Sequence, residues 1–206
     1  NPVGEGKVTL RTYLTLINFK ANHRKTLVVD EGDQWTTLVA SANPHDGSSA
    51  HSNTALRTSG PIALAVLASE QAVLGFSAPE VLAETPWPEG TTPQQLRQWQ
   101  PQAADTAPTV ELLTEGAIEK ALLSAVNQAQ PGEKLWIEVF YFSHIKLQKA
   151  LIQAHKRGVE VRVILDPNKD AFGREKNGIP NRQVARKLHR AGIPVRWCHT
   201  HGEQCH

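Results

Sequence analysis

The spacing of apolar residues divides the chain into two different halves. In the first half, three segments are rich in β-branched and aromatic residues. Apolar and polar residues alternate within them, so we expect them to be strands. They are residues 7–19, 24–29 and 35–42, with a further short strand expected at 55–57. A turn at Gly32 joins the second segment to the third and predicts a hairpin. Residues 61–74 instead repeat apolar positions at helical spacing behind Pro61.

After residue 113 the pattern changes to helices that alternate with strands. Thr114 and Ser143 are candidate caps for two helices that end before Gly132 and Gly158, and a third helix is expected at 182–190. The strands between and after them are predicted at 135–142, 159–165 and 193–197. Strands that alternate with helices over short joints indicate a parallel sheet flanked by helices, so this half is α/β.

A proline-rich segment separates the two halves. Five prolines lie among Glu, Gln and Thr, with little apolar periodicity, as is typical of a connector. We therefore predict a first domain at 1–82, a linker at 83–110 and a second domain at 111–206.

Composition excludes little. The 206 residues are 40% hydrophobic and 20% charged, which is ordinary for a globular protein. A net charge of +2 is too small to indicate nucleic-acid binding by bulk electrostatics. No apolar run is long enough for a membrane span, and no segment resembles a signal peptide. The chain contains no methionine, even at position 1, so we expect it to be a piece of a longer protein.

One short segment combines three side chains suited to phosphate chemistry. Residues 22–30 contain His23, Lys25 and Asp30 in the spacing His-x-Lys-x-x-x-x-Asp. On a strand, His23 and Lys25 would share one face and could both contact one phosphate. Asp30 has the opposite parity to Lys25 and lies at the strand end, so it reaches them only if the backbone turns there. The alternative is a solvated His and Lys at a surface strand end.

Two other groups of residues imitate a site. His144 and Lys146 repeat the His-x-Lys spacing, but leucine stands at position 151 and the segment is predicted to begin a helix. The stretch from Cys198 to His206 contains two cysteines and three histidines, whose spacing matches no paired-ligand zinc pattern. We expect two separate thiols there rather than a metal site or a disulfide.

These residues together resemble the phospholipase D superfamily, in its bacterial cardiolipin synthase-like branch. Residues 22–30 are similar to its HKD signature. Ser41 and Asn43 are similar to the Gly-Ser-x-Asn that follows it, with Ala40 in place of glycine. Stretches of the second half resemble the opening of the family's other lobe; they are 138–142, 154–166 and 192–196. That lobe leads to a second HKD motif, whose histidine would be His206.

The resemblance implies a mixed, largely parallel α/β fold in which the chain spans the back half of one lobe and the front half of the next. It also implies cleavage or exchange of phosphodiesters without a metal or other cofactor, through a covalent phosphohistidine. His23 would be the nucleophile, with Asp30 a candidate to orient it, and His206 would transfer protons. The phosphate oxygens would be bound by a set of donors: Lys25, Ser41 and Asn43.

Three functions remain open at this point. The first is a phospholipase D or phosphatidyltransferase whose parent is a bacterial, membrane-associated enzyme acting on phospholipids. The second is a nuclease-type phosphodiesterase that needs no metal, against which the near-neutral charge argues. The third is an inactive fragment that needs a complementary piece of polypeptide, or a homodimer that brings two copies of His23 together.

Overall fold

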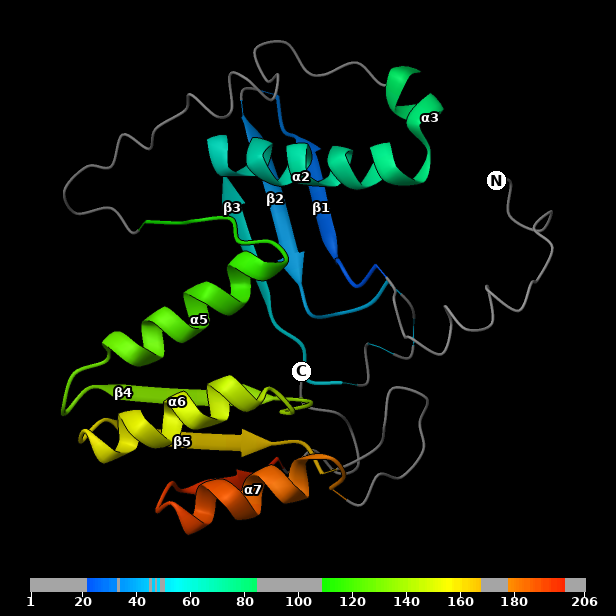
Figure 1. Ribbon diagram of the computed structural model, residues 1–206. Coiled ribbons are helices and arrows are strands. Elements are labelled where there is room, and N and C mark those ends of the chain that lie inside the picture. Colours follow the sequence, from blue (N-terminus) through cyan, green and yellow to red (C-terminus); the bar gives the residue numbers. More distant parts are fainter. Residues whose placement is uncertain are drawn as a thin grey trace. The chain divides into compact units, whose positions relative to one another are not determined.

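The computed structural model describes residues 22–32, 34–44, 46, 48, 51–84, 109–167 and 178–198. Contacts divide the chain into two units, which are described separately below. Unit 1 comprises 1–39 and 56–112, and unit 2 comprises 40–55 and 113–206. Two three-stranded sheets with helices confirm the predicted mixed α/β class (Figure 1). Within the described ranges, no helix combines the length and apolar character needed to cross a bilayer.

Unit 1 is built on an antiparallel hairpin. Its strands are β1 (Thr26–Asp30), β2 (Trp35–Ala40) and β3 (Ala55–Ser59), in the order β1-β2-β3. Asp30 pairs with Trp35 across the turn, and Gly32 adopts a φ of 88° that favours glycine. The predicted hairpin is therefore confirmed, although β1 begins two residues later than residue 24. The strand expected at 7–19 lies outside the described residues.

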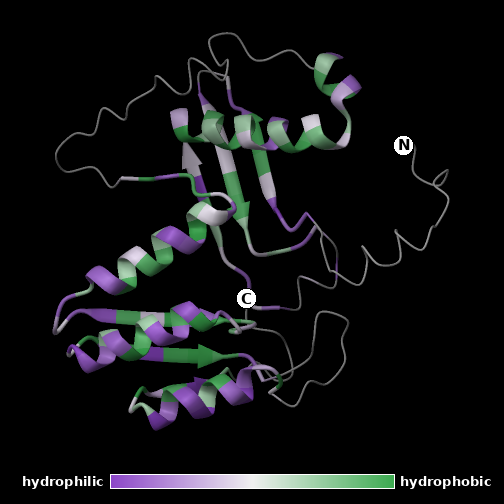
Figure 2. Ribbon diagram, viewed as in Figure 1, coloured by the Kyte–Doolittle hydropathy of each residue, from purple (hydrophilic) through white to green (hydrophobic). Residues whose placement is uncertain are grey.

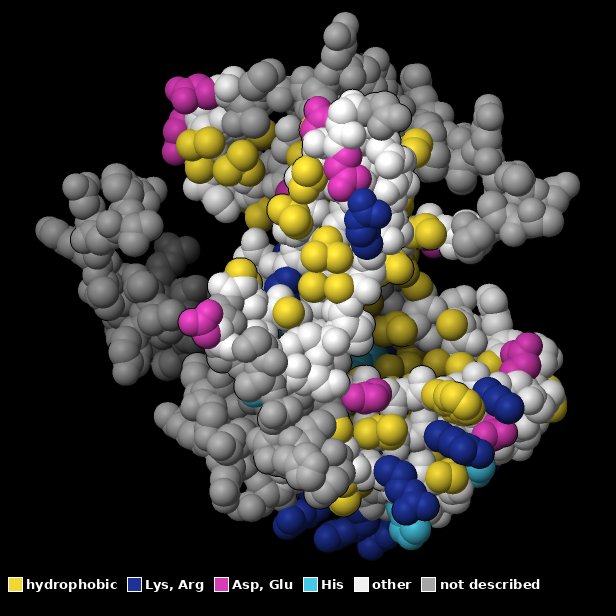
Figure 3. Space-filling model, turned by 180° about the vertical axis from the view of Figure 1, so that it is seen from behind, with side chains coloured by type: hydrophobic (Ala, Val, Ile, Leu, Met, Phe, Trp, Pro, Cys, Tyr) yellow, Lys and Arg dark blue, Asp and Glu magenta, His cyan; other side chains and the backbone are white. Residues whose placement is uncertain are grey.

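Helix α2 (Pro61–Ser77) covers one face of this sheet and is followed by α3 (Pro79–Glu84) (Figure 1). α2 begins with proline in its first turn, as expected. The helix α3 was not predicted, and most of the proline-rich connector lies outside the described residues. The opposite sheet face leaves apolar side chains exposed, among them Leu27, Leu38 and Leu56, and Figure 3 shows hydrophobic side chains gathered there.

Unit 2 contains the predicted parallel sheet. Its strands are β4 (Lys134–Val139), β5 (Glu160–Leu165) and β6 (Val195–Trp197), and both neighbouring pairs are parallel. Its helices are α5 (Gly116–Gln128), α6 (Ile145–Lys156) and α7 (Asn181–Arg190). Gly158 and Gly192, both with positive φ, follow α6 and α7 as the sequence predicts.

One hydrophobic core lies between the sheet of unit 2 and its helices. β5 alternates, so that Val161, Val163 and Leu165 are buried while Arg162 and Ile164 point to the other face. Buried residues of α6 and α7 complete the core: Ala150, Leu151, Ala154, Val184 and Leu188. Figure 2 colours most of β5 hydrophobic and most of α7 hydrophilic, as expected for a central strand beneath a surface helix.

Two predicted helix caps are wrong. Glu115, not Thr114, is the N-cap of α5 and makes no side-chain cap hydrogen bond. α6 is capped by His144 rather than Ser143, because the Nδ1 atom of His144 accepts from the backbone N–H of Leu147 at 3.1 Å. Cap preference favours serine, but the imidazole is placed one residue closer to the helix and supplies the acceptor instead.

Candidate functional site

His23 and Lys25 lie in the extended segment immediately before β1. The Lys25 Nζ donates to the backbone carbonyl oxygen of His23 at 2.8 Å, so the cation is held beside the main chain of the histidine. The His23 side chain is exposed and that of Lys25 is half-buried. Partial burial lowers the pKa of Lys25, because desolvation disfavours the charged ammonium. An ammonium group that has lost part of its hydration is stabilised when a phosphate oxygen accepts its hydrogen bonds.

Asp30 lies at the other end of β1. Five residues of strand separate its Cα from that of Lys25 by about 16 Å at ~3.3 Å per residue. Its Oδ1 accepts from the backbone N–H of Gly32 at 2.9 Å, which is the bond of an Asx turn. The structure therefore gives Asp30 a role in closing the hairpin and does not bring it to His23 of the same chain.

Arg24 anchors the segment, a role that the sequence analysis missed. Its NH1 donates to Ser69 Oγ at 2.7 Å and to Glu70 Oε1 at 3.1 Å, both on α2. Alternation along an extended chain then turns His23 and Lys25 away from this helix. The arginine is visible in the sequence, but its partners are more than forty residues away and no local pattern links them.

Ser41 and Asn43 belong to the loop at 40–55 in unit 2, and their side chains differ in availability. The Ser41 hydroxyl donates to Asn53 Oδ1 at 3.2 Å and accepts from the Thr54 N–H at 3.0 Å. Its only donor hydrogen is thereby used. The Asn43 backbone N–H donates to Ser48 Oγ at 2.9 Å, while its side-chain amide has no hydrogen bond to any described residue. Asn43 is therefore the better phosphate donor of the two.

Asn53, for which the sequence analysis offered no role, organises this loop. Its Nδ2 donates to the backbone carbonyls of Ser48 at 2.7 Å and His51 at 3.0 Å, and its Oδ1 accepts from Ser41. These bonds fix the turn that carries Asn43. An isolated asparagine in a loop gives no signal in the sequence that it holds three partners.

The last predicted site residue, His206, lies outside the described residues. His23, Lys25 and Asp30 belong to unit 1, and each group of site residues is placed only within its own unit. Near the C-terminus, Cys198 is disulfide-bonded, so the expectation of two separate thiols is wrong.

A buried asparagine joins the connections that follow β4 and β5. Asn181 accepts from the Phe142 N–H at 2.9 Å and donates to the carbonyls of Phe140 at 2.7 Å and Asp166 at 2.9 Å. It is completely buried. β4 ends at Val139, earlier than the predicted residue 142, because Asn181 takes over backbone groups that a neighbouring strand would otherwise bind. This fixes the carboxyl edge of the sheet, where α/β sheets bind ligands.

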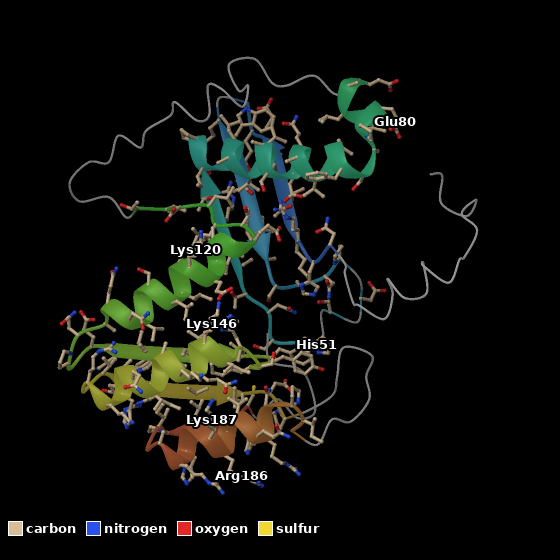
Figure 4. All side chains as sticks on the ribbon, in the orientation of Figure 1. His51, Glu80, Lys120, Lys146, Arg186 and Lys187 are labelled. Atoms are coloured by element: carbon tan, nitrogen blue, oxygen red, sulfur yellow. The ribbon has the colours of Figure 1, made fainter. Side chains whose placement is uncertain are left out.

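The second His-x-Lys pair serves α6, as expected. Lys146 Nζ lies 2.8 Å and His144 Nε2 3.5 Å from Glu119 Oε1 on α5 (Figure 4 labels Lys146). The hydrogen bond with Lys146 is the main reason why the pKa of Glu119 is lowered, and Glu119 raises the pKa of Lys146. The prediction that this segment begins a helix is confirmed, and both side chains of the pair lie against Glu119 of α5.

Comparison with known families finds a similarity for the second half of the chain. Residues 122–206 match the family model described as cardiolipin synthase, phospholipase D-like domain. No curated protein and no solved structure matches the chain. These residues are therefore similar to the cardiolipin synthase-like branch of the phospholipase D superfamily, which confirms the predicted resemblance for this part of the chain. This is a family of phosphodiesterase and phosphatidyltransferase type, generally enzymatic. The match does not reach residues 22–30, whose likeness to the HKD motif stays a prediction.

Proposed function

We propose that this protein cleaves or exchanges the phosphodiester of a phospholipid through a phosphohistidine formed at His23. The observation that carries the proposal is the match of 122–206 to the cardiolipin synthase domain, in a chain that also holds an exposed imidazole with Lys25 beside it. A neutral imidazole is a competent nucleophile near neutral pH. The match to a cardiolipin synthase family favours a lipid substrate over nucleic acid.

The reaction would have two steps, formation of the phosphohistidine and its breakdown. A lone pair of the His23 imidazole forms a bond to phosphorus, and the phosphorus–oxygen ester bond breaks as the alkoxide leaves with a proton from His206. In the second step His206 removes a proton from water or from an acceptor hydroxyl. The resulting oxygen forms a bond to phosphorus as the phosphorus–nitrogen bond breaks and frees His23.

The remaining residues act on charge and geometry. The Lys25 ammonium and the Asn43 amide would bind the non-bridging oxygens, where negative charge develops in the transition state. Arg24 would act as a positioning residue, because it ties the segment to α2. Asp30 would contribute only through the hairpin turn, since its carboxylate bonds Gly32.

The test is turnover of phosphatidylglycerol in mixed micelles with a chelator present. We expect His23→Ala to abolish product, and Lys25→Ala to lower kcat by about 10²–10³-fold, which is typical for the loss of one oxyanion donor. Asn43→Ala should cost more than Ser41→Ala, whose hydroxyl already bonds Asn53. His189→Ala, an exposed histidine of α7, is the matched control and should leave turnover unchanged.

Two outcomes would overturn the proposal. One is full turnover in His23→Ala. The other is metal-independent nicking of DNA or RNA, lost in His23→Ala, by a protein that leaves phosphatidylglycerol intact; that result would establish the nuclease alternative.

A further inference from the structure

The helices α6 and α7 are basic in a chain whose charges nearly balance. The whole chain has 22 Lys and Arg against 20 Asp and Glu, yet neither helix contains an acidic residue. Their cations, with the residue that follows α6, are Lys146, Lys149, Lys156, Arg157, Arg182, Arg186, Lys187 and Arg190. Figure 4 labels Arg186 and Lys187 on α7.

Few of these cations are neutralised. Lys146 pairs with Glu119, Lys187 Nζ donates to Gln148 Oε1, and Arg157 donates to the last carbonyls of α5. The others are exposed and form no ion pair with any residue that the structure describes: Lys149, Lys156, Arg182, Arg186 and Arg190. A surface with unpaired charge of one sign attracts a partner of the opposite sign.

Exposed apolar side chains lie at one end of these helices. In a parallel sheet with returning helices, the carboxyl ends of the strands and the starts of the following helices share one edge. Four large side chains are exposed at that edge: Tyr141 (44%), Ile145 (62%), Ile179 (63%) and Trp197 (44%). They form the apolar rim. A Cβ built on Gly178 would lie 3.6 Å from Trp197 Cη2, so the indole lies close to the turn that precedes α7.

We propose that the basic flank of α6 and α7, together with the apolar rim, is a docking surface for an anionic phospholipid bilayer. Each Lys or Arg near such a surface contributes about 1 kcal/mol, equivalent to about fivefold in partition. Isoleucine enters the acyl boundary, while Tyr and Trp side chains lie at the headgroup level. A nucleic acid would account for the cations but not for Ile145 and Ile179, because bases stack on aromatic rings rather than on branched aliphatic chains.

The surface would turn the carboxyl edge of the sheet toward the lipid. Ligands of α/β sheets bind at this edge, so it would meet a phospholipid headgroup while the lipid stays in the bilayer. In this respect the inference rests on the proposed function. The charge and the rim are features of unit 2 alone and depend on no catalytic residue.

The test is flotation of the protein with phosphatidylcholine vesicles, with and without phosphatidylglycerol. We expect binding only when phosphatidylglycerol is present. Arg186→Gln with Arg190→Gln should lower the partition coefficient about 25-fold at low salt, from fivefold per charge. The matched control, Lys134→Gln with Arg162→Gln, removes the same charge from the opposite sheet face and should change partition less than about twofold, because such distant charges are screened.

Ile145→Ser with Ile179→Ser separates the bilayer from nucleic acid. We expect roughly a tenfold loss of vesicle binding that persists at high salt, because burial of apolar surface is not screened. The docking surface is refuted if the protein does not bind vesicles, or if the control pair reduces vesicle binding as much as the α7 pair. It is also refuted if the protein binds duplex DNA at the same salt and the isoleucine pair changes the binding of neither DNA nor vesicles. Vesicle binding by an inactive protein would refute the proposed function alone, and turnover of a water-soluble phosphodiester without vesicle binding would refute the surface alone.

Discussion

The two sheets have the same number of strands but are held together in different ways. The parallel sheet of unit 2 rests on a continuous apolar core that includes Leu151, Leu165 and Leu188, all completely buried. In the described part of unit 1, the buried apolar side chains are Ala63 and Val66, and the other buried side chains are polar. The family match lies in unit 2, whereas the proposed nucleophile lies in unit 1, whose described part has fewer buried apolar side chains.

Polar contacts supplement the few buried apolar side chains in the described part of unit 1. The Thr37 hydroxyl donates to the Leu27 carbonyl at 3.0 Å, and Thr36 donates to Glu31 at 2.5 Å and lies 2.9 Å from Ser59. A net hydrogen bond contributes only about 1 kcal/mol. The comparison indicates that unit 1 is the first part to lose its structure, and that the geometry around His23 depends on a few bonds.

The largest effect expected from this difference compares two leucines. Leu188→Ala should lower the free energy of unfolding by about 3–5 kcal/mol, because its buried methyl groups leave a cavity. Leu27→Ala, at a side chain that is 57% exposed, should cost less than about 1 kcal/mol. Urea unfolding followed by circular dichroism measures both. An equal loss at Leu27 would contradict the comparison and show that the open face of the β1–β3 sheet is covered.

A smaller effect is expected at the anchor of the nucleophile segment. Arg24→Ala should cost roughly 1 kcal/mol, since the pair with Glu70 is only partly buried. We expect the fall in kcat to correspond to more than this loss of unfolding free energy, because His23 and Lys25 would no longer be held in one orientation. Glu70→Gln keeps an acceptor for Arg24 and serves as the milder variant. If Arg24→Ala left kcat unchanged while stability fell, Arg24 would be purely structural.

The smallest effects appear in the pH dependence of stability. Hydrogen bonds from Thr36 and Arg57 lower the pKa of Glu31, and Lys146 lowers that of Glu119. Each carboxylate stabilises its unit above its ordinary pKa of 4.5, and this stabilisation is lost as the pH falls through the lowered value. Lys146, whose pKa is raised, stabilises unit 2 below 10.5 and ceases to do so in stronger alkali.

Thermal unfolding against pH tests this difference between the units. Glu31→Gln should reduce the fall in the melting temperature of unit 1 at acid pH. Glu119→Gln should reduce the fall in the melting temperature of unit 2 at both acid and alkaline pH, because the Glu119–Lys146 pair produces both. An unchanged loss of thermal stability at alkaline pH in Glu119→Gln would contradict this assignment.

Elements with a strong local signal could be predicted from the sequence. The alternation in 160–165 and the Gly158 and Gly192 stops located β5 and the ends of two helices, because period and backbone freedom are local properties. Strand ends set by distant partners could not be predicted. β4 stops early because Asn181, some forty residues away, takes up its backbone groups.

The site divides along the same line. The residue types at His23 and Lys25 were visible in the sequence, and the structure adds the bond between them. The anchoring by Arg24 and the loop contacts of Asn53 join residues that only folding brings together. The alternation of side chains along a strand showed that Asp30 could reach Lys25 only if the backbone turned. The turn forms, but the Asp30 carboxylate accepts from the Gly32 N–H within it and does not reach Lys25.

The central claim is that a phosphorus–nitrogen bond forms at His23. It is tested most directly by quenching the protein in alkali during turnover of phosphatidylglycerol with a chelator present, followed by mass spectrometry of its peptides. The proposal predicts a phosphatidyl adduct on the peptide that contains His23, absent in His23→Ala. Turnover without an adduct on that peptide, or an unchanged adduct elsewhere in His23→Ala, would contradict it.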